Sequence, residues 1–286
     1  MSHFLRFIIV LGWLSLGAAA GAVDDHPLRL RIGLLPGESA PTVLRLNEPM
    51  RAYLERQLGF PVELEVGTTY AATGEALRFG RIDIAYLGPV TYVLQRDRSP
   101  LVPFARPSHP NVGPVFEAAI IVPADSAVQT LKDLAGTGVA FGDPASTSGT
   151  WVPQYELLQS GLVAGRDYDA HFLGSHDAVA LAVANGKSDA GGISLPIYER
   201  LIKEGKVDPA KLRVLTVSRP IPEYAFTFRS GLDPDFRVRV AAAFLSIDDP
   251  ATLGVFRADG FVPAVDADFD ATREWVATLK AERAGQ

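Results

Sequence analysis

Three consecutive hydroxyl side chains, Ser146, Thr147 and Ser148, are the residues best placed to do chemistry. They follow an apolar run at 138–141 that predicts a short strand, and they precede a helical pattern at 150–158. A helix N-terminus presents unpaired backbone N–H groups and the positive end of a dipole, and serine and threonine add O–H donors. The stretch therefore predicts a site for a tetrahedral oxyanion that needs no lysine. The alternative is that one hydroxyl only caps the helix and the others are loop residues.

His176 is the second candidate, in the sequence Ser175-His176-Asp177 before another apolar helical pattern. Ser175 is placed to cap this helix, so His176 lies in the first turn, where the dipole disfavours an imidazolium without a nearby anion. A bound oxyanion would be such a partner, and affinity would then weaken as pH rises through the pKa of an imidazolium contact. The alternative is a histidine that only packs or caps. Asp177 suits the helix dipole and has no predicted ligand contact.

Two tyrosines lie where strands end. Tyr70 follows an apolar run and begins a helical pattern, which is the strand-to-helix turn where α/β folds bind ligands. A buried core tyrosine is the alternative. Tyr86 precedes a Gly-Pro turn and is predicted to wall the same pocket. Arg81 and Asp83, in the same stretch, are predicted to lie on a solvated strand edge without a ligand role.

The N-terminus predicts export. Residues 1–6 are weakly basic, 7–16 are mostly apolar and 17–22 are small, so 1–22 has the pattern of a secretory signal peptide. Its apolar core at 7–16 is too short to span a bilayer. A net charge of -6 argues against nucleic acid or an acidic membrane surface as partner. The chain has no cysteine, which excludes disulfides, thiolate metal sites and a lipidated cysteine. We therefore expect a free periplasmic protein that is not lipid-anchored.

Strand and helix patterns alternate along the whole chain. The runs at 30–35, 50–58, 62–66, 71–79 and 82–87 predict strand, helix, strand, helix and strand, and hence a mostly parallel sheet covered by helices. The alternation continues through 120–122, 138–141, 178–184, 189–193, 195–202 and 212–217, so the fold class is α/β. The proline-rich stretch 100–114 predicts a long surface loop.

Three blocks carry a resemblance to a known family: FGRIDIAYLGP at 79–89, GDPASTSG at 142–149, and GSHD at 174–177 leading to Asn185-Gly186 and Asp189-Ala190. With these blocks in this order, the sequence from about 28 to 262 resembles the phosphonate-, phosphite- and phosphate-binding proteins of ABC importers. The resemblance implies the two-lobed periplasmic binding fold of type II, with the ligand between the lobes. It places lobe one at 23–117 plus 225–286 and lobe two at 118–224.

The resemblance also implies a ligand set. It adds the aromatic residues Phe116 and Tyr224 to Tyr70, Tyr86, the hydroxyl triplet and His176. Relatives that bind aminoalkyl phosphonates carry acidic residues for the amine, at positions that are Pro196 and Tyr224 here. An ammonium without a carboxylate in a dry cleft is unfavourable, so we predict a ligand without an amine. Glu223, beside Tyr224, could restore the carboxylate, which leaves this question open.

The sequence thus predicts a monomeric periplasmic binding protein that captures a small tetrahedral oxyanion, such as phosphite, methylphosphonate, phosphate or a close analogue. Its partner would be the permease of an ABC importer, and no metal or cofactor is expected. The alternative is a periplasmic subunit that senses an oxyanion for a membrane histidine kinase. No G-x-S-x-G elbow or metal-spaced histidine pair occurs, so no catalytic residue is predicted. His109 is predicted to be a surface residue.

Overall fold

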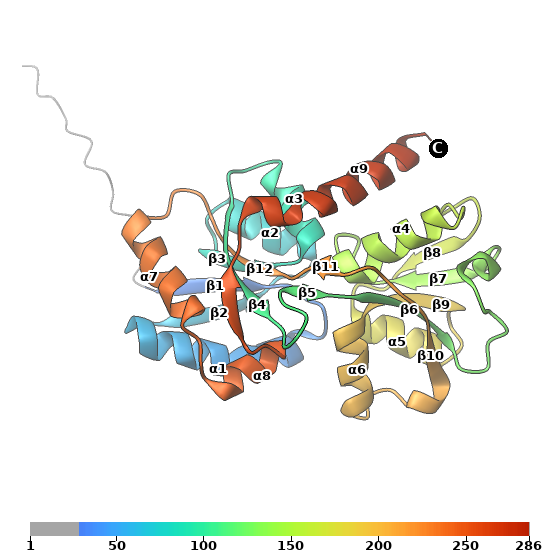
Figure 1. Ribbon diagram of the computed structural model, residues 1–286, viewed down its shortest axis with the longest axis horizontal. Coiled ribbons are helices and arrows are strands. Elements are labelled where there is room, and N and C mark those ends of the chain that lie inside the picture. Colours follow the sequence, from blue (N-terminus) through green and yellow to red (C-terminus); the bar gives the residue numbers. More distant parts are fainter. Residues whose placement is uncertain (1–28, 286) are drawn as a thin grey trace, which may run out of the picture.

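Two sheets divide the chain between two lobes. The computed structural model describes residues 29–285, so the predicted signal peptide lies outside the described residues. One lobe is built on a six-stranded sheet and the other on a five-stranded sheet, and they lie side by side in Figure 1. We call them lobe one and lobe two.

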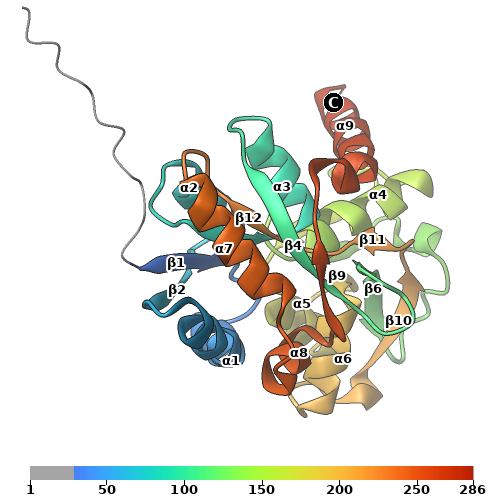
Figure 2. The same ribbon diagram turned by 60° about the vertical axis from the view of Figure 1, so that its left-hand side comes forward.

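Lobe one has the strand order β13-β4-β12-β3-β1-β2. Its strands are β1 (Leu30–Leu34), β2 (Val62–Val66), β3 (Ile84–Leu87), β4 (Val102–Ser108), β12 (Ala225–Phe228) and β13 (Gly260–Pro263). Its helices are α1 (Ala40–Leu58), α2 (Tyr70–Arg78), α3 (Pro89–Arg96), α7 (Pro234–Leu245), α8 (Pro250–Phe256) and α9 (Asp270–Ala284), with a 3-10 turn at Asp266–Phe269. Successive strand residues face opposite cores, as Ile84 and Ala85 do. Helices α1 and α7 cover one face, and α2, α3 and α9 cover the other (Figure 2).

Lobe two has the strand order β10-β6-β9-β7-β8. Its strands are β6 (Ala118–Pro123), β7 (Gly138–Phe141), β8 (Asp169–Phe172), β9 (Ala190–Ser194) and β10 (Leu212–Val217). Its helices are α4 (Val152–Gln159), α5 (His176–Ala184) and α6 (Leu195–Lys203), with 3-10 turns at Leu131–Leu134 and Pro209–Lys211 and a π-helical turn at Thr147–Trp151. Ile120 packs toward α4, and Ile121 packs toward α5 and α6.

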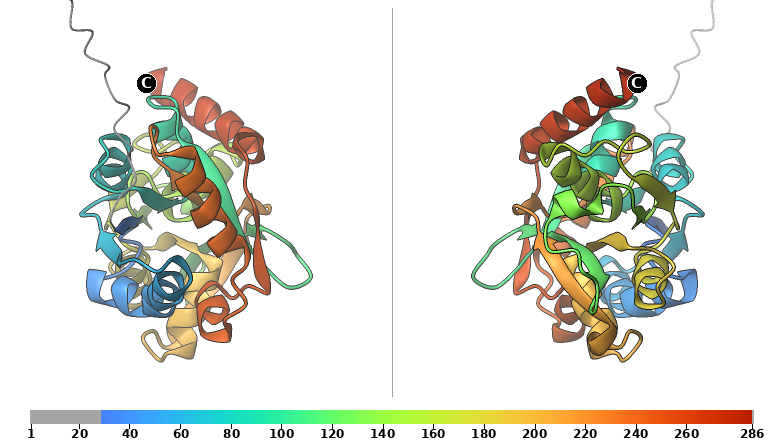
Figure 3. Two further views of the ribbon diagram at one scale, coloured as in Figure 1. Left: turned by 90° about the vertical axis from the view of Figure 1, so that its left-hand side faces the viewer. Right: turned by 90° about the vertical axis from the view of Figure 1, so that its right-hand side faces the viewer.

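The chain crosses between the lobes through a short antiparallel pair, β5 (Val115–Phe116) and β11 (Ile221–Pro222). The strands that follow, β6 and β12, run antiparallel to their neighbours β9 and β3, whereas β1, β2 and β3 are parallel, as are β7, β8 and β9. Both crossing strands enter their sheet from the cleft, where the parallel strands end. The predicted α/β class is confirmed, but each sheet is mixed rather than mostly parallel, because β4, β10 and β13 also pair antiparallel to their neighbours. Helix α9 lies against α3 of lobe one and α4 of lobe two (Figure 3).

Most predicted elements are present, and β2, β7 and β10 have the predicted bounds. Helix α1 starts at Ala40, ten residues before the predicted start at 50. Two prolines hid this part of the helix. Pro41 stands in the first turn, where proline is tolerated, but Pro49 stands inside the helix, where it removes a backbone hydrogen bond.

The predicted loop at 100–114 is wrong, because β4 is an interior strand of the sheet. Its first half pairs with β12 and its second half with β13. Pro103 lies in the first half and Pro107 in the second, so each proline pairs on one side only. Proline is tolerated in a sheet where its nitrogen faces a side without a ladder hydrogen bond, and each of these prolines has one such side.

Asp83 is buried, so its predicted place on a solvated strand edge is wrong; the side chain is 0% exposed. Its carboxylate accepts hydrogen bonds from the Arg31 backbone N–H at 3.0 Å, from Arg31 Nη2 at 2.8 Å and from Arg229 Nε at 3.2 Å. The residue therefore ties the start of β3 to β1 and to the end of β12. Arg81, by contrast, is exposed.

We expect Asp83→Asn to lower the free energy of unfolding by about 3 kcal/mol, because it removes the buried anion that the guanidinium groups of Arg31 and Arg229 contact. Urea denaturation measures this change. Arg81→Gln is the matched control and should change the value by less than about 0.5 kcal/mol. An Asp83→Asn protein as stable as the control would contradict the structural role.

Candidate functional site

The hydroxyl triplet begins a turn of π-helix rather than an ordinary α-helix. Ser146 is the N-cap of this turn, its Oγ accepts the Gly149 N–H at 3.1 Å, and its carbonyl accepts the Trp151 N–H at 3.1 Å. The capping alternative therefore holds for Ser146. Gly149 has to be glycine, since a Cβ there would lie 2.9 Å from both Ser146 Oγ and His176 Cε1.

The other two hydroxyls differ in what they contact. Thr147 Oγ1 accepts the backbone N–H of Val90 at 2.9 Å, a hydrogen bond between the lobes at the start of α3. Ser148 Oγ is buried and makes no hydrogen bond to any described residue. It faces the Tyr224 phenol, but the two groups make no hydrogen bond of normal geometry. Thus Ser148 has an unused donor, whereas Thr147 already holds the lobes together.

His176 is the first residue of α5 and is 1% exposed. Its Nδ1 accepts the backbone N–H of Ser194 at 3.2 Å, so the neutral ring carries its proton on Nε2. Nε2 is buried and has no partner among the described residues. Burial lowers the pKa of His176 to about 4, although Asp177 raises it in part. The imidazolium considered from the sequence is therefore disfavoured here, and His176 offers a neutral N–H donor.

Tyr70 and Tyr224 bring two phenols to the same point. Tyr70 is the first residue of α2 and is 2% exposed, while Tyr224 lies between β11 and β12. Burial raises the pKa of both phenols, so they stay protonated; Tyr70 contacts Ser146, and the two phenols contact each other. A Cβ at Gly37 would lie 3.1 Å from Tyr70 Oη and 3.6 Å from His176 Cδ2. Gly37 thus lies beside both donors.

We call the side chains of Tyr70, Ser146, Ser148, His176 and Tyr224 the niche. Its donors come from lobe one, lobe two and the return crossing, and each is neutral in the protonation state just described. Fixed neutral dipoles of this kind can stabilise an anion without a mobile counter-charge. Opening of the lobes would separate these donors.

Two supporting residues were not predicted. Asp143 is 5% exposed, and its Oδ2 accepts the Tyr70 backbone N–H at 3.0 Å while Oδ1 accepts that of Ala145 at 2.7 Å. It therefore joins the start of α2 to the turn before the triplet. Gly37 was also missed. The Pro-Gly turn after the apolar run at 30–35 was the available signal for it.

A cavity of about 570 Å³ adjoins the niche and is lined in part by Gly37, Tyr70 and Tyr224. Tyr86 and Phe116, the remaining predicted residues, lie on its wall. The Phe116 ring packs edge-on against Tyr224 at 5.4 Å, and Tyr86 stacks on Phe226 at 4.5 Å. The eight predicted residues thus come together, with five in the niche, two on the cavity wall, and Thr147 in the contact between the lobes.

Glu223 lies on the cavity wall, but both of its carboxylate oxygens are occupied. Oε2 is 2.6 Å from His109 Nε2, and Oε1 accepts the Tyr224 N–H at 2.8 Å. The hydrogen bond between His109 and Glu223 raises the pKa of His109, which favours an ion pair between the two side chains. His109 is partly exposed, so it lies near the surface as predicted, but its pairing with a residue far away in sequence was not predicted.

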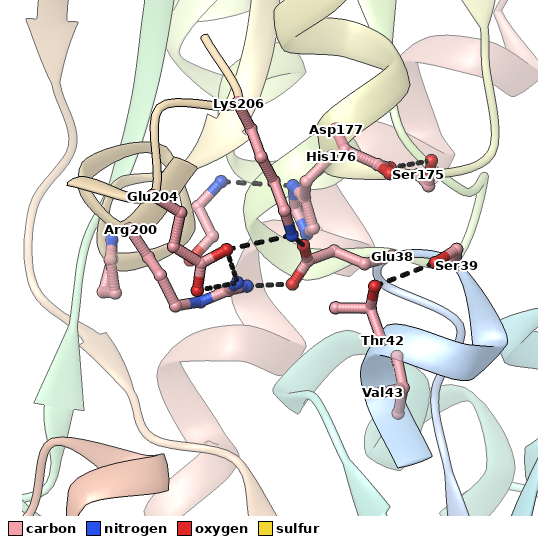
Figure 4. A network of polar contacts seen from close by, with 12 residues as sticks. Glu38, Ser39, Thr42, Val43, Ser175, His176, Asp177, Arg200, Glu204 and Lys206 are labelled. Carbon is pink, nitrogen blue, oxygen red and sulfur yellow. Dashed lines mark hydrogen bonds and ion pairs between the residues drawn. The ribbon is translucent and has the colours of Figure 1, made fainter. Parts of the chain in front are cut away.

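Ion pairs cross the cleft next to Gly37, and Figure 4 shows them. Glu38 is 6% exposed and pairs with Arg200 of α6, while Lys206 Nζ lies 3.8 Å from its other oxygen. Glu204 contacts both cations, Lys206 at 2.9 Å and Arg200 at 3.3 Å. The backbone N–H of His176 also donates to the Gly37 carbonyl at 3.0 Å. The structure is therefore a closed conformation, held in part by charges at the rim.

No group of three potential metal-ligating residues occurs within residues 29–285. In the same part of the chain, no helix is long and apolar enough to cross a membrane.

We expect Arg200→Ala to weaken anion binding about fivefold, because losing this pair lowers the population of the closed state to which the ligand binds. Calorimetry with methylphosphonate measures the change. Lys203→Ala, which changes an exposed residue on the same helix, is the control. Equal affinities of the two variants would contradict a role for the Glu38–Arg200 pair in closure.

The pKa of His176 predicts how stability depends on pH. An unfolded histidine titrates near pH 6.5, whereas the buried ring titrates at about 4. Between these values the unfolded state binds the extra proton, so the free energy of unfolding must fall as pH drops. Wild type should lose about 3 kcal/mol relative to His176→Gln between pH 6.5 and 4 in urea denaturation. Parallel pH profiles for the two proteins would rule out a neutral buried ring.

The comparisons with known proteins agree with this geometry. A model of the family "ABC transporter, phosphonate, periplasmic substrate-binding protein" matches residues 32–269. The phosphate-import protein PhnD of Mycolicibacterium smegmatis is 29% identical over 87% of this chain and 85% of its own length. The phosphonates-binding periplasmic protein of Escherichia coli is 26% identical over 78% of this chain and 67% of its own length.

Solved structures show the same fold. PhnD1 of Prochlorococcus marinus, in complex with methylphosphonate, superposes with a TM-score of 0.82 at 22% identity, covering 88% of this chain and 98% of that one. A binding protein of an ABC phosphonate transporter from Pseudomonas aeruginosa gives 0.81 at 23% identity, covering 88% and 86%. The two-lobed type II fold is thereby confirmed. With the family model spanning most of its length, the chain belongs to the phosphonate periplasmic substrate-binding proteins of ABC transporters.

Proposed function

We propose that this protein binds a phosphonate or a closely related tetrahedral oxyanion in the niche and delivers it to the permease of an ABC importer. Phosphite, methylphosphonate and phosphate are anions that such a site would take. We further propose that the protein acts as a monomer in the periplasm, exported by residues 1–22 and free of a lipid anchor.

The pair of unused donors at Ser148 Oγ and His176 Nε2 carries this proposal. Both atoms are buried and lack a hydrogen-bond partner among the described residues. An unsatisfied buried polar group costs about 1–3 kcal/mol, so two of them beside two phenols are explained best by a ligand that accepts from all four. An oxyanion has this acceptor capacity, and it carries the negative charge that strengthens each hydrogen bond.

Transport is favoured over the other functions considered. The relatives are described as import and binding proteins, and they give the sensing alternative no support. Catalysis is not proposed, because the family consists of binding proteins. In addition, His176 Nδ1 already accepts the Ser194 N–H, so Nε2 carries the ring proton and neither nitrogen is free to act as a general base.

Ser148→Ala tests the proposal. The hydroxyl makes no hydrogen bond within the protein, so its loss should leave the melting temperature unchanged, while a lost hydrogen bond to an anion should weaken binding about ten- to hundredfold. Calorimetry against phosphate, phosphite and methylphosphonate measures this. Ser146→Ala is the comparison: it removes the cap of the π-helical turn, so it should also lower the melting temperature. Unchanged affinity in Ser148→Ala would remove the main support for the niche.

A further inference from the structure

The cavity beside the niche is much larger than a methyl group. Its volume of about 570 Å³ lies within the range of roughly 300–1,000 Å³ for pockets that hold drug-sized ligands. It reaches the niche at Tyr70 and Tyr224, beside Gly37. An anion held by the niche donors would therefore have one direction free, and a substituent pointing that way would enter the cavity.

The cavity walls are largely apolar and come from both lobes. Lobe one contributes Leu35, the α1 side chains Val43 and Leu46, and Phe256 of α8. The crossing strand contributes Phe116, and α6 contributes Ile197. Such walls favour apolar groups, because each buried methylene contributes favourably to binding.

The charges on these walls are mostly paired within the protein. Glu38 contacts Arg200, Glu199 lies 2.8 Å from Arg257, and Glu223 contacts His109. Each of these carboxylates already has a cation. An ammonium on the ligand would have to compete with the basic side chain that already pairs with each carboxylate.

Glu117 is the exception. It lines the cavity, and no basic side chain pairs with it among residues 29–285, but it is partly exposed, so water can solvate its carboxylate. It therefore supplies the alternative outcome of the test.

From this geometry we propose that the natural ligand is a phosphonate whose substituent is uncharged, apolar and several carbon atoms long. This inference rests on the proposed function: the head group occupies the niche and the substituent occupies the cavity. The paired carboxylates disfavour a charged substituent, and the volume allows a longer one than methyl.

Calorimetry with methyl-, propyl- and 2-aminoethylphosphonate tests the inference. Each added methylene should tighten binding about fourfold, so propylphosphonate should bind about fifteenfold more tightly than methylphosphonate. 2-Aminoethylphosphonate has nearly the same shape as propylphosphonate but ends in an ammonium, and it should bind about tenfold more weakly than propylphosphonate.

The variants Val43→Trp and Leu44→Trp locate the substituent. Val43 lines the cavity, so a tryptophan there should abolish the preference for propyl over methyl. Leu44, its neighbour on α1, is 38% exposed and does not line the cavity, so its tryptophan variant should keep the preference. Melting temperatures would show that both variants fold, and the wild-type series tests the inference independently of them.

The outcomes separate the two proposals. If phosphate, phosphite and all the phosphonates fail to bind, the proposed function is wrong. If methylphosphonate binds and propylphosphonate binds no better, only the inference about the substituent is wrong. If 2-aminoethylphosphonate binds more tightly than propylphosphonate, and Glu117→Gln abolishes that advantage, the substituent is cationic and the inference is overturned.

Discussion

A hydrogen bond from the Ser194 backbone to His176 Nδ1 fixes the proton that the binding site can offer. Because Nδ1 is an acceptor, the ring proton lies on Nε2. This interaction joins the end of β9 to the start of α5, so the sheet of lobe two itself orients the ring. Burial then keeps the ring neutral. The site is thereby committed to neutral hydrogen-bond donors. On the proposed function, it recognises an anion through donor geometry instead of net charge.

Neutral donors can act this way only where water is excluded, and the contacts between the lobes provide that exclusion. Asp143 holds the start of α2 through the Tyr70 N–H, and Thr147 holds the start of α3 through the Val90 N–H. Outside them, the Glu38–Arg200 pair closes the rim. On the proposed function, closure would therefore assemble the donors in one movement, as expected for hinge closure around a ligand.

The local patterns of the sequence predicted most of the fold, and the residues expected for the site lie close together in the structure. The strand periods of β2, β7 and β10 were clear, and the hydroxyl triplet marked the turn after β7. Prolines caused the main errors, because their tolerance in β4 and α1 depends on which neighbours pair with each backbone group. The burial of Asp83 could not be predicted either, since its partners Arg31 and Arg229 lie 52 and 146 residues away in sequence. The same holds for His109, whose partner Glu223 lies 114 residues away. The contact that sets Thr147 apart from Ser148 is made with Val90, which lies 57 residues away in sequence.

A crystal structure of the complex with methylphosphonate would test the central claim most directly. We predict that the phosphonate oxygens lie within about 2.7–3.2 Å of Ser148 Oγ, His176 Nε2 and the two phenols, with the methyl carbon directed toward the cavity. An anion bound by arginine or lysine side chains elsewhere in the cleft, with Ser148 and His176 still without partners, would contradict the account.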